Sequence, residues 1–524
     1  MTNNILVVEF SDVNADYCLT PSIYKPLAFI ISPFTTEEYV TMYKKLSILL
    51  GLSVLSSVSM LASAQNLYMN DLKLKADLDW LNTQGVAQIS TSTWPLTANE
   101  IKRALNTANA QTPAQQQILQ SVQTRLNQNR NSVVKGSAAL HIQTDRDQLP
   151  QRFDDDKLAG QQASVGVSLS EAEWEFNLQA NLKNDKLIDD SSDVSFEGSY
   201  LAGTAANQWL IAGKIPTWWG PGHDGSLIRG DASLPVAGFT MQRDQQTAPT
   251  SQYLSWVGPW QYQLFAGQLE DYEAIPDAKL FGGRLTASPW EWLEVGASRT
   301  FMWGGEGRPQ SFGSFTDALL GTKDNGDNGA TIGEDPANQL GGFDARLNLA
   351  PLINVPAGVY AQYIGEDEAG GLPAKNMYLA GIDYASAAYG KPYQLYAEYT
   401  DTRTSGEVSG ISYDHSIYTD GYYQQGFPLG YALGGDVESI ALGGRLWLDD
   451  RNFINAKLQH AKVNQADEAI NQAFPTTDKL TGIDVAWEHQ YNPQTLISSR
   501  IWAVESDIQS TDIGVGVGIE LQTY

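Results

Sequence analysis

The 524-residue chain has a single cysteine, few basic residues and five scattered histidines, and each scarcity excludes a class of function. Cys18 precedes a predicted export signal, so the mature protein has no disulfide, cysteine-ligated metal or cysteine nucleophile. The 33 basic residues stand against 60 acidic ones, a net charge of -27, which excludes the cationic surface that nucleic acid requires. The histidines lack metal-ligand spacing, and no phosphate-loop, HExxH or GxSxG motif occurs. The sequence therefore indicates no cofactor and no metal.

Residues 42–64 have the features of a cleaved signal peptide. A basic pair, Lys44 and Lys45, precedes a serine-containing apolar run and the small-residue triplet Ala62-Ser63-Ala64, after which we expect cleavage. The run is too short for a membrane-spanning helix. The 41 residues ahead of it carry five acids and one lysine. We interpret residues 1–41 as a mis-assigned upstream extension, with translation starting at Met42.

Residues 65–132 predict a small helical domain. Leucines from Leu72 to Leu81 follow helical spacing, and Gly85 lies where a helix commonly ends. Thr97 and Glu100 have the spacing of a capping box. Pro113 occupies the first position of a further predicted helix.

From residue 133 to residue 524 apolar and polar side chains alternate with the period of a β-strand. The clearest case is Ile513 to Leu521, where branched apolar residues alternate with glycines and polar residues. Several such strands are about ten residues long and follow an export signal, which favours a transmembrane antiparallel β-barrel over a soluble sandwich. Long irregular segments at 214–252, 303–340 and 402–437 predict loops that lie outside the barrel or fold into it.

Several segments resemble the Wzi family of outer-membrane capsule-assembly lectins, over essentially all of 65–524. They are LNTQGV and STSTWPL near the mature start, IPTWWGPGHDGSLIRGDA (215–232), WVGPWQYQ (256–263), WGGEGRPQSF (303–312), PANQL (336–340), IGEDEAGGLPAKNMYLAG (364–381) and YTDGYYQQGFPLG (418–430).

The resemblance implies a monomeric barrel of about 18 strands with a periplasmic helical bundle. It implies a non-enzymatic protein of the outer membrane that binds capsular polysaccharide and holds the capsule at the cell surface. Its expected partners are that polysaccharide, outer-membrane lipid and other capsule export and assembly proteins.

Candidate sugar-binding residues lie in the long predicted loops. Aromatic faces stack on sugar C–H surfaces, and a loop stiffened by proline presents them at low ordering cost. The candidates of this kind are Trp218, Trp219, Tyr422, Tyr423 and Gln424. The pattern is equally compatible with packing of these side chains inside the barrel.

Arginines form a second set of candidates, because many capsules are acidic and a guanidinium holds a carboxylate with two parallel hydrogen bonds. They are Arg229, Arg243, Arg299 and Arg308. Structural pairing with an acidic residue is the commoner role of an arginine in a barrel lumen, and Asp231 lies two residues from Arg229.

Two other functions compete with a lectin. A porin-like channel for sugars or anions requires an open lumen, against which the long loops argue. A surface glycosidase requires a pair of carboxylates, for which Glu366 and Glu368 are candidates, although acidic runs in loops are usually solvated.

Overall fold

The computed structural model describes residues 66–128, 134–144, 153, 159–186, 192–230, 233–321, 337–369, 372–404, 411–467 and 474–523. The upstream extension and the signal peptide that we predict at 1–41 and 42–64 lie outside these residues. Asp231 lies outside them as well.

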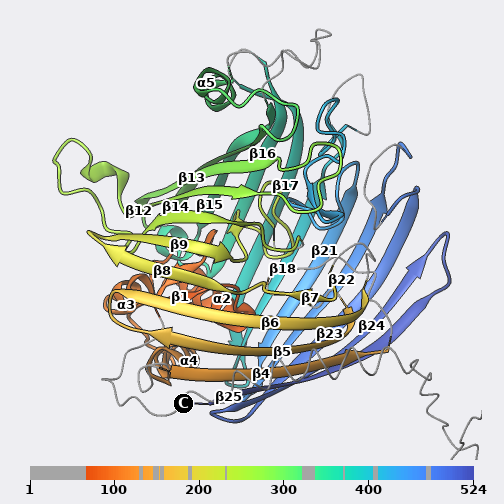
Figure 1. Cartoon of the computed structure of the whole chain (residues 1–524). Helices are drawn as coiled ribbons and strands as arrows, with labels where there is room; N and C mark the ends of the chain where they lie inside the picture. Colours follow the sequence, from red (N-terminus) through yellow and green to blue (C-terminus); the bar gives the residue numbers. More distant parts are fainter. Residues whose placement is uncertain are drawn as a thin grey trace, which may run out of the picture. The chain divides into compact units, whose positions relative to one another are not determined.

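Most of the strands form one closed antiparallel barrel (Figure 1). The wall strands are β4 (Val134–Gln143), β5 (Ala159–Ser170), β6 (Trp174–Lys186), β7 (Val194–Ser195), β8 (Tyr200–Ala205), β9 (Gln208–Lys214), β11 (Ala237–Arg243), β12 (Trp260–Gln268), β13 (Lys279–Trp290), β14 (Leu293–Trp303), β15 (Ala337–Asn348), β16 (Ala357–Ala369), β17 (Leu372–Ala388), β18 (Lys391–Asp401), β21 (Glu438–Trp447), β22 (Asn452–Val463), β23 (Asp478–Asn492), β24 (Thr495–Ser506) and β25 (Asp512–Thr523). Strands β7 and β8 both pair with β6 and act as two parts of one interrupted strand. Among the described residues the wall therefore has 18 strands, closed where β25 pairs with β4, and the predicted fold is confirmed.

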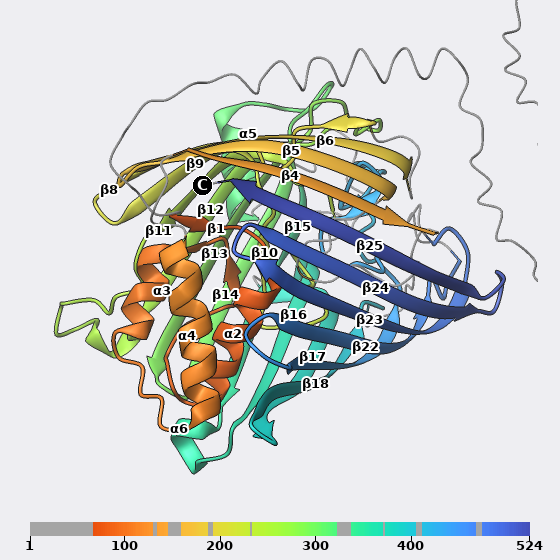
Figure 2. The same ribbon diagram turned by 90° about the horizontal axis from the view of Figure 1, so that it is seen from below.

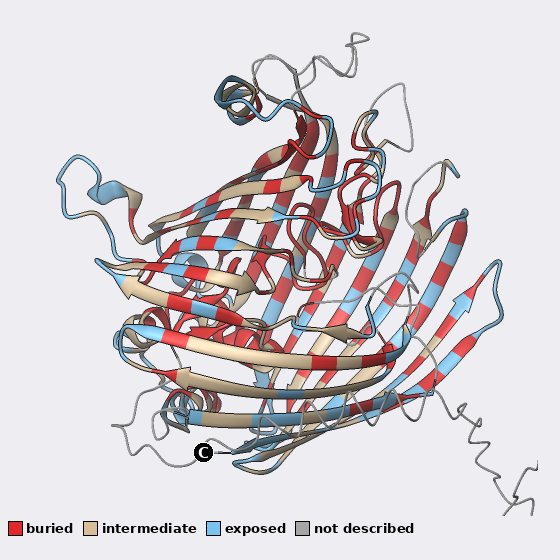
Figure 3. Cartoon of the chain, viewed as in Figure 1, coloured by how far each residue is buried: buried red, intermediate tan, exposed pale blue. Residues whose placement is uncertain are grey.

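Alternation along each strand separates an apolar outer face from a polar inner face, and Figure 3 shows the resulting bands of buried and exposed residues. In β25, Ile513, Val515 and Val517 are 73%, 43% and 55% exposed and point outward. Gly514 points inward, where an added Cβ would overlap the ring of Trp502. The small residues of the inner face thus make room for large side chains inside the barrel.

The two ends of the barrel differ in the length of their connections. One end has two-residue turns at 206–207, 291–292, 389–390 and 493–494, and it holds the start of β4 and the end of β25. The opposite end carries the connections 215–236, 304–336 and 402–437. Outer-membrane barrels keep short turns on the periplasmic side, so the long connections lie on the extracellular side.

One sequence prediction about these connections was wrong. The segment 214–252 was expected to be irregular throughout, but β11 lies within it and pairs with β9 and β12. Outward Phe239 and Met241 alternate with inward Thr240 and Gln242. The run is only seven residues long and continues directly into polar residues, so its period is hard to recognise in sequence.

The N-terminal segment has the predicted helices and lies within the short-turn end of the barrel (Figure 2). It comprises β1 (Leu67–Tyr68), α2 (Leu72–Thr83), β2 (Thr93–Trp94), β3 (Leu96–Thr97), α3 (Ala98–Leu105) and α4 (Pro113–Gln128). The Thr97 hydroxyl accepts from the Glu100 amide at 3.1 Å, and Gly85 has φ 68°, as the cap patterns predict. No helix among the described residues is long and apolar enough to cross a bilayer.

These helices share their core with the barrel wall. The Trp80 indole in α2 donates to the carbonyl of Tyr393 in β18 at 3.1 Å, and Trp447 in β21 donates to Asp77 at 2.6 Å. Their apolar cluster also includes Trp218, Ala385 and Trp447. The segment therefore packs as a plug against the wall.

Candidate functional site

The extracellular connection 215–236 descends into the lumen and meets the N-terminal plug. Its strand β10 (Trp218–Trp219) pairs with β2, with Trp218 opposite Trp94. The Gly220 amide donates to the carbonyl of Ser92 at 2.9 Å. The lumen is thus filled from both ends by segments that contact each other.

A buried network of charges holds this contact together. Lys75 and Asp79 of α2 form an ion pair at 2.9 Å. The His223 ring lies 3.5 Å from the Asp79 carboxylate on one side and 3.0 Å from Asp383 of β17 on the other. Arg346 of β15 then pairs with Asp383 at 2.6 Å. Buried charges need such partners, because an isolated one is costly in a low-dielectric interior.

Burial sets the protonation of this network. Burial, reinforced by the charge of Arg445 and only partly opposed by Asp383 and Asp79, lowers the pKa of His223 to about 4. Burial alone would raise the pKa of Asp79, but the nearby positive charges, that of Lys75 first and that of Arg445 among the others, bring it below its ordinary value. His223 is consequently neutral at physiological pH, and Asp79 is ionised.

The aromatic candidates lie inside the packed lumen. Trp218 is 2% exposed and meets Phe153 edge-on with ring centroids 5.6 Å apart. Trp219 is fully buried and donates from its indole nitrogen to Gln263. Their faces are covered by protein, so their positions favour the packing role over direct stacking on sugar.

The second aromatic cluster is equally enclosed. It lies in the connection between β18 and β21, in the hairpin β19 (Tyr423–Gln424) and β20 (Phe427–Pro428) and the residue before it. The Tyr422 hydroxyl donates to the carbonyl of Ile228 at 2.8 Å, and the Gln424 side-chain oxygen accepts from the Glu270 amide at 3.1 Å. Tyr422, Tyr423 and Gln424 are at most 3% exposed. The hydrogen bonds of Tyr422 and Gln424 join the hairpin to neighbouring loops.

The arginines are separated from one another in the structure. Arg229 packs over the ring of Phe265 at 4.8 Å, and Arg243 over Trp260 at 4.0 Å near the periplasmic end. Arg299 points outward from β14 and donates to the carbonyl of Ala318 at 3.3 Å. Arg308 packs over the ring of Tyr418 at 5.7 Å, in an extracellular loop.

Three extracellular segments, 269–278, 304–310 and 411–437, interlock over the lumen, and we call them the cap. The Tyr272 hydroxyl donates to the carbonyls of Tyr418 and Gly421 at 3.0 and 2.9 Å. The Tyr418 hydroxyl donates to the carbonyl of Gly304 at 3.1 Å, and Gln425 to Asp271 at 2.7 Å. These contacts join all three segments, and sequence reasoning missed them because they connect residues more than 100 positions apart.

Of the candidate arginines, Arg308 lies within the cap segment 304–310. It is 9% exposed, and Glu306, Gly307 and Pro309 around it are exposed. Asp271 and Glu273 of the neighbouring segment are exposed as well. The cap therefore presents exposed carboxylates, which accept hydrogen bonds, and holds the largely buried Arg308, whose guanidinium donates them.

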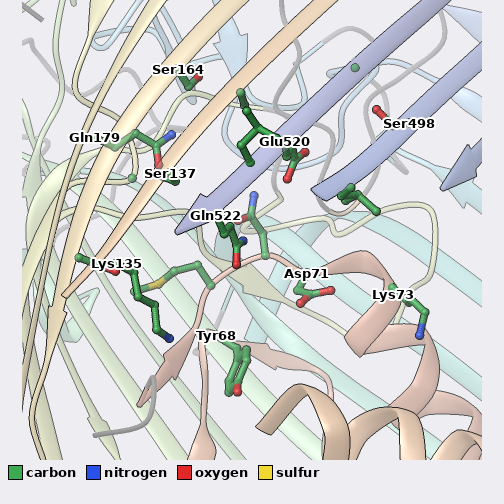
Figure 4. A pocket seen from close by; sticks show the side chains of 18 of the residues that line it. Tyr68, Asp71, Lys73, Lys135, Ser137, Ser164, Gln179, Ser498, Glu520 and Gln522 are labelled. Carbon is green, nitrogen blue, oxygen red and sulfur yellow. The ribbon is translucent and has the colours of Figure 1, made fainter. Parts of the chain in front are cut away.

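A polar cavity of about 730 Å³ lies between the plug and the inner face of β4, β5, β6, β24 and β25. Serine, glutamine and charged side chains line it, including Ser137, Ser164, Gln179, Glu520 and Lys135 (Figure 4). The sequence signal for it was the polar, small-residue face of these strands. The cavity adjoins Asp450 and Gln494 of the short turns, so it belongs to the periplasmic half of the barrel.

The carboxylates considered for glycoside hydrolysis do not form a described pair. Glu366 is 7% exposed and accepts from the backbone amide of Tyr413. The side chain of Glu368 lies outside the described residues. The structure thus gives Glu366 a role in holding the cap.

These features define an outer-membrane β-barrel whose lumen is occupied by its own plug and loops. The family model of the capsule assembly protein Wzi matches residues 129–509, and the chain belongs to this family. It is 41% identical over 485 residues to an uncharacterized 55.8 kDa protein in the cps region of Klebsiella pneumoniae, covering 92% of this chain and 94% of that protein.

A solved structure is similar as well. It is that of Wzi of Escherichia coli, described as an outer membrane protein involved in group 1 capsule assembly and as a carbohydrate binding β-barrel. The TM-score is 0.79 at 39% identity, covering 87% of this chain and 99% of that one.

Proposed function

We propose that the protein binds capsular polysaccharide at the cell surface and so attaches the capsule to the outer membrane. The interlocked cap carries this proposal, because it makes the extracellular end a fixed surface that can contact a polymer. Family membership and the carbohydrate-binding relative from Escherichia coli support it.

We place the binding surface on the cap around Arg308. Polysaccharides offer many hydroxyl groups, which donate to carboxylates such as Glu306 and Asp271. A sugar carboxylate would be repelled by most of a chain of charge -27, so it would need a guanidinium such as that of Arg308 to hold it. The preorganised cap lowers the ordering cost that weakens binding to mobile loops.

A channel and a glycosidase are less well supported. The ion pairs of Asp79 and Asp383 occupy the lumen at the level where a pore would run. We therefore expect no steady conductance in planar bilayers. We also expect no catalysis, because Glu366 is engaged with a backbone amide.

The test is a titration of the mature protein in detergent with the capsular polysaccharide of its own strain, following both binding and polymer length. We expect saturable binding at constant length, about tenfold weaker in Arg308→Ala, as the loss of a charge-assisted hydrogen bond implies. Arg403→Ala is the matched control, since Arg403 is an extracellular-side arginine outside the cap that pairs with Asp401 at 2.7 Å. Shortening of the polymer would indicate an enzyme, and absence of binding would contradict the proposal.

We further propose that the protein is a monomer and that capsule export and assembly proteins bind its periplasmic end. Light scattering of the detergent complex, with and without polymer, measures the number of protein molecules in the complex.

Crosslinking in intact cells tests whether assembly proteins bind the periplasmic end. Equal recovery of crosslinked partners when the plug is altered would argue against this binding.

A further inference from the structure

A groove of about 500 Å³ lies in the wall formed by β12 to β16, away from the cap and the lumen. Its lining is mostly apolar and includes glycines of three strands. The outward-facing lining residues include Leu264, Gly283, Leu285, Gly341, Phe343 and Gly365, and Arg299 at the extracellular side.

The groove opens on the outer surface of the barrel. Leu264, Leu285 and Phe343 are 51%, 51% and 54% exposed. Arg284 adjoins Leu285 in its strand, and Asp344 adjoins Phe343. Both point into the lumen, where they form an ion pair at 2.6 Å. Since successive side chains of a strand face opposite ways, the groove faces the hydrocarbon of the membrane.

Glycines create the depression. Gly283 lies opposite Leu264 in the ladder, and Gly341 lies opposite Gly365. Because these positions have no side chains, the outer surface of the wall is depressed between the exposed leucines and Phe343. Branched side chains there would give the even apolar face seen on β25.

A helix borders the groove on its extracellular side. Helix α5 (Phe312–Leu320) packs Phe315 against Phe281 and Trp303 at 5.1 and 5.4 Å, above the wall in Figure 1. Arg299 lines the groove and donates to the carbonyl of Ala318 in this helix. Phe312 and Leu320 are 83% and 66% exposed, so α5 extends the apolar surface beside the groove.

We propose that this groove binds an acyl chain of an outer-leaflet lipid. It is continuous with the apolar outer face that the membrane already covers, and it lies in the extracellular half of the wall under α5. An apolar lining offers dispersion contacts and few hydrogen bonds, which suits a hydrocarbon chain. A second copy of the protein carries the same net negative charge, and like net charges oppose association.

The test uses the mature protein in phosphatidylcholine vesicles that contain a trace of phosphatidylglycerol with a photoreactive diazirine in its acyl chain. After irradiation, the crosslinked peptides are mapped by mass spectrometry. We expect severalfold more label on β12, β13 and β15 than on β21 to β23. Gly283→Leu and Gly341→Leu should each remove more than half of that excess by filling the groove.

Gly444→Leu is the matched control. A Cβ at Gly283 would lie 3.3 Å from Leu264, and a Cβ at Gly444 would lie 3.3 Å from Leu395, on a wall segment that does not line the groove. Gly444→Leu should leave the label on β12 to β15 unchanged. Even labelling around the wall would overturn the proposal. A crosslink between two protein molecules through this face would also overturn the proposal if Gly341→Leu abolished it, since it would identify a second copy of the protein as the occupant. Polysaccharide binding should be unchanged in every variant, which separates this test from that of the cap.

Discussion

His223 lies 3.5 Å from the Asp79 carboxylate, and this pair joins two segments that enter the barrel from opposite ends. His223 belongs to the extracellular connection 215–236, whereas Asp79 belongs to helix α2 of the plug. The same imidazole contacts Asp383 in the wall at 3.0 Å. Plug, loop and wall therefore share one buried set of polar contacts, and a change in any of them should affect the stability of the whole barrel.

Acidification should destabilise the protein through His223. Its pKa in the folded protein is about 4, below the 6.5 of an unfolded chain, so the unfolded state binds the proton first. The stability that neutral His223 contributes is complete above pH 6.5 and is lost as the pH falls toward 4, by about 3 kcal/mol at most. Thermal unfolding in detergent between pH 7.5 and 4.5 measures this loss.

The variant His223→Asn tests the assignment of that slope to one residue. The pH dependence between 6.5 and 4.5 should become shallower, because the titrating imidazole is absent. His460→Asn, at an exposed position of β22, should keep the slope of the parent protein. An unchanged slope in His223→Asn would assign the effect to other groups.

Removal of Asp79 should be strongly destabilising. Asp79→Ala leaves Lys75, which is 1% exposed, without its partner at 2.9 Å. Breaking one member of a buried ion pair costs about 3–5 kcal/mol. The free energy of unfolding in urea measures it. For comparison, Asp507→Ala breaks an exposed pair with Lys479 at 3.4 Å and should cost no more than about 1 kcal/mol. If the two variants lost the same free energy of unfolding, the buried contact between plug and loop would contribute no more to stability than the exposed ion pair.

Trp218→Ala should separate packing from sugar contact. Trp218 contacts Phe153 and donates to the carbonyl of Gly220 at 2.9 Å, so its truncation should cost about 3–5 kcal/mol of stability. We expect the folded fraction to bind polysaccharide with unchanged affinity. Weakened binding by a fully folded variant, seen in the titration proposed above, would restore Trp218 as a contact residue.

The sequence predicted the barrel better than the position of its loops. Alternation of side chains is local, so the strands from Ile513 to Leu521 and from Trp174 onward could be recognised directly. The buried contact of His223 with Asp79 depends on how far a loop descends into the lumen, which no local pattern encodes. For the same reason, the sequence identified Trp218 and Tyr422 as candidate site residues but did not determine whether sugar or protein covers their rings.

An arginine in the middle of the outer face should test the position of the membrane. Leu442 of β21 is 48% exposed and lies opposite Leu458 and Ala397 in the wall. Leu442→Arg should cost about 2–4 kcal/mol in phospholipid vesicles, because a charge at the midplane of the bilayer is poorly solvated. Ile513→Arg, near the extracellular end of β25, should cost about 1 kcal/mol or less, since its guanidinium can reach the headgroups. Unfolding by urea in vesicles compares the two variants, and equal costs would place the hydrocarbon elsewhere on the wall.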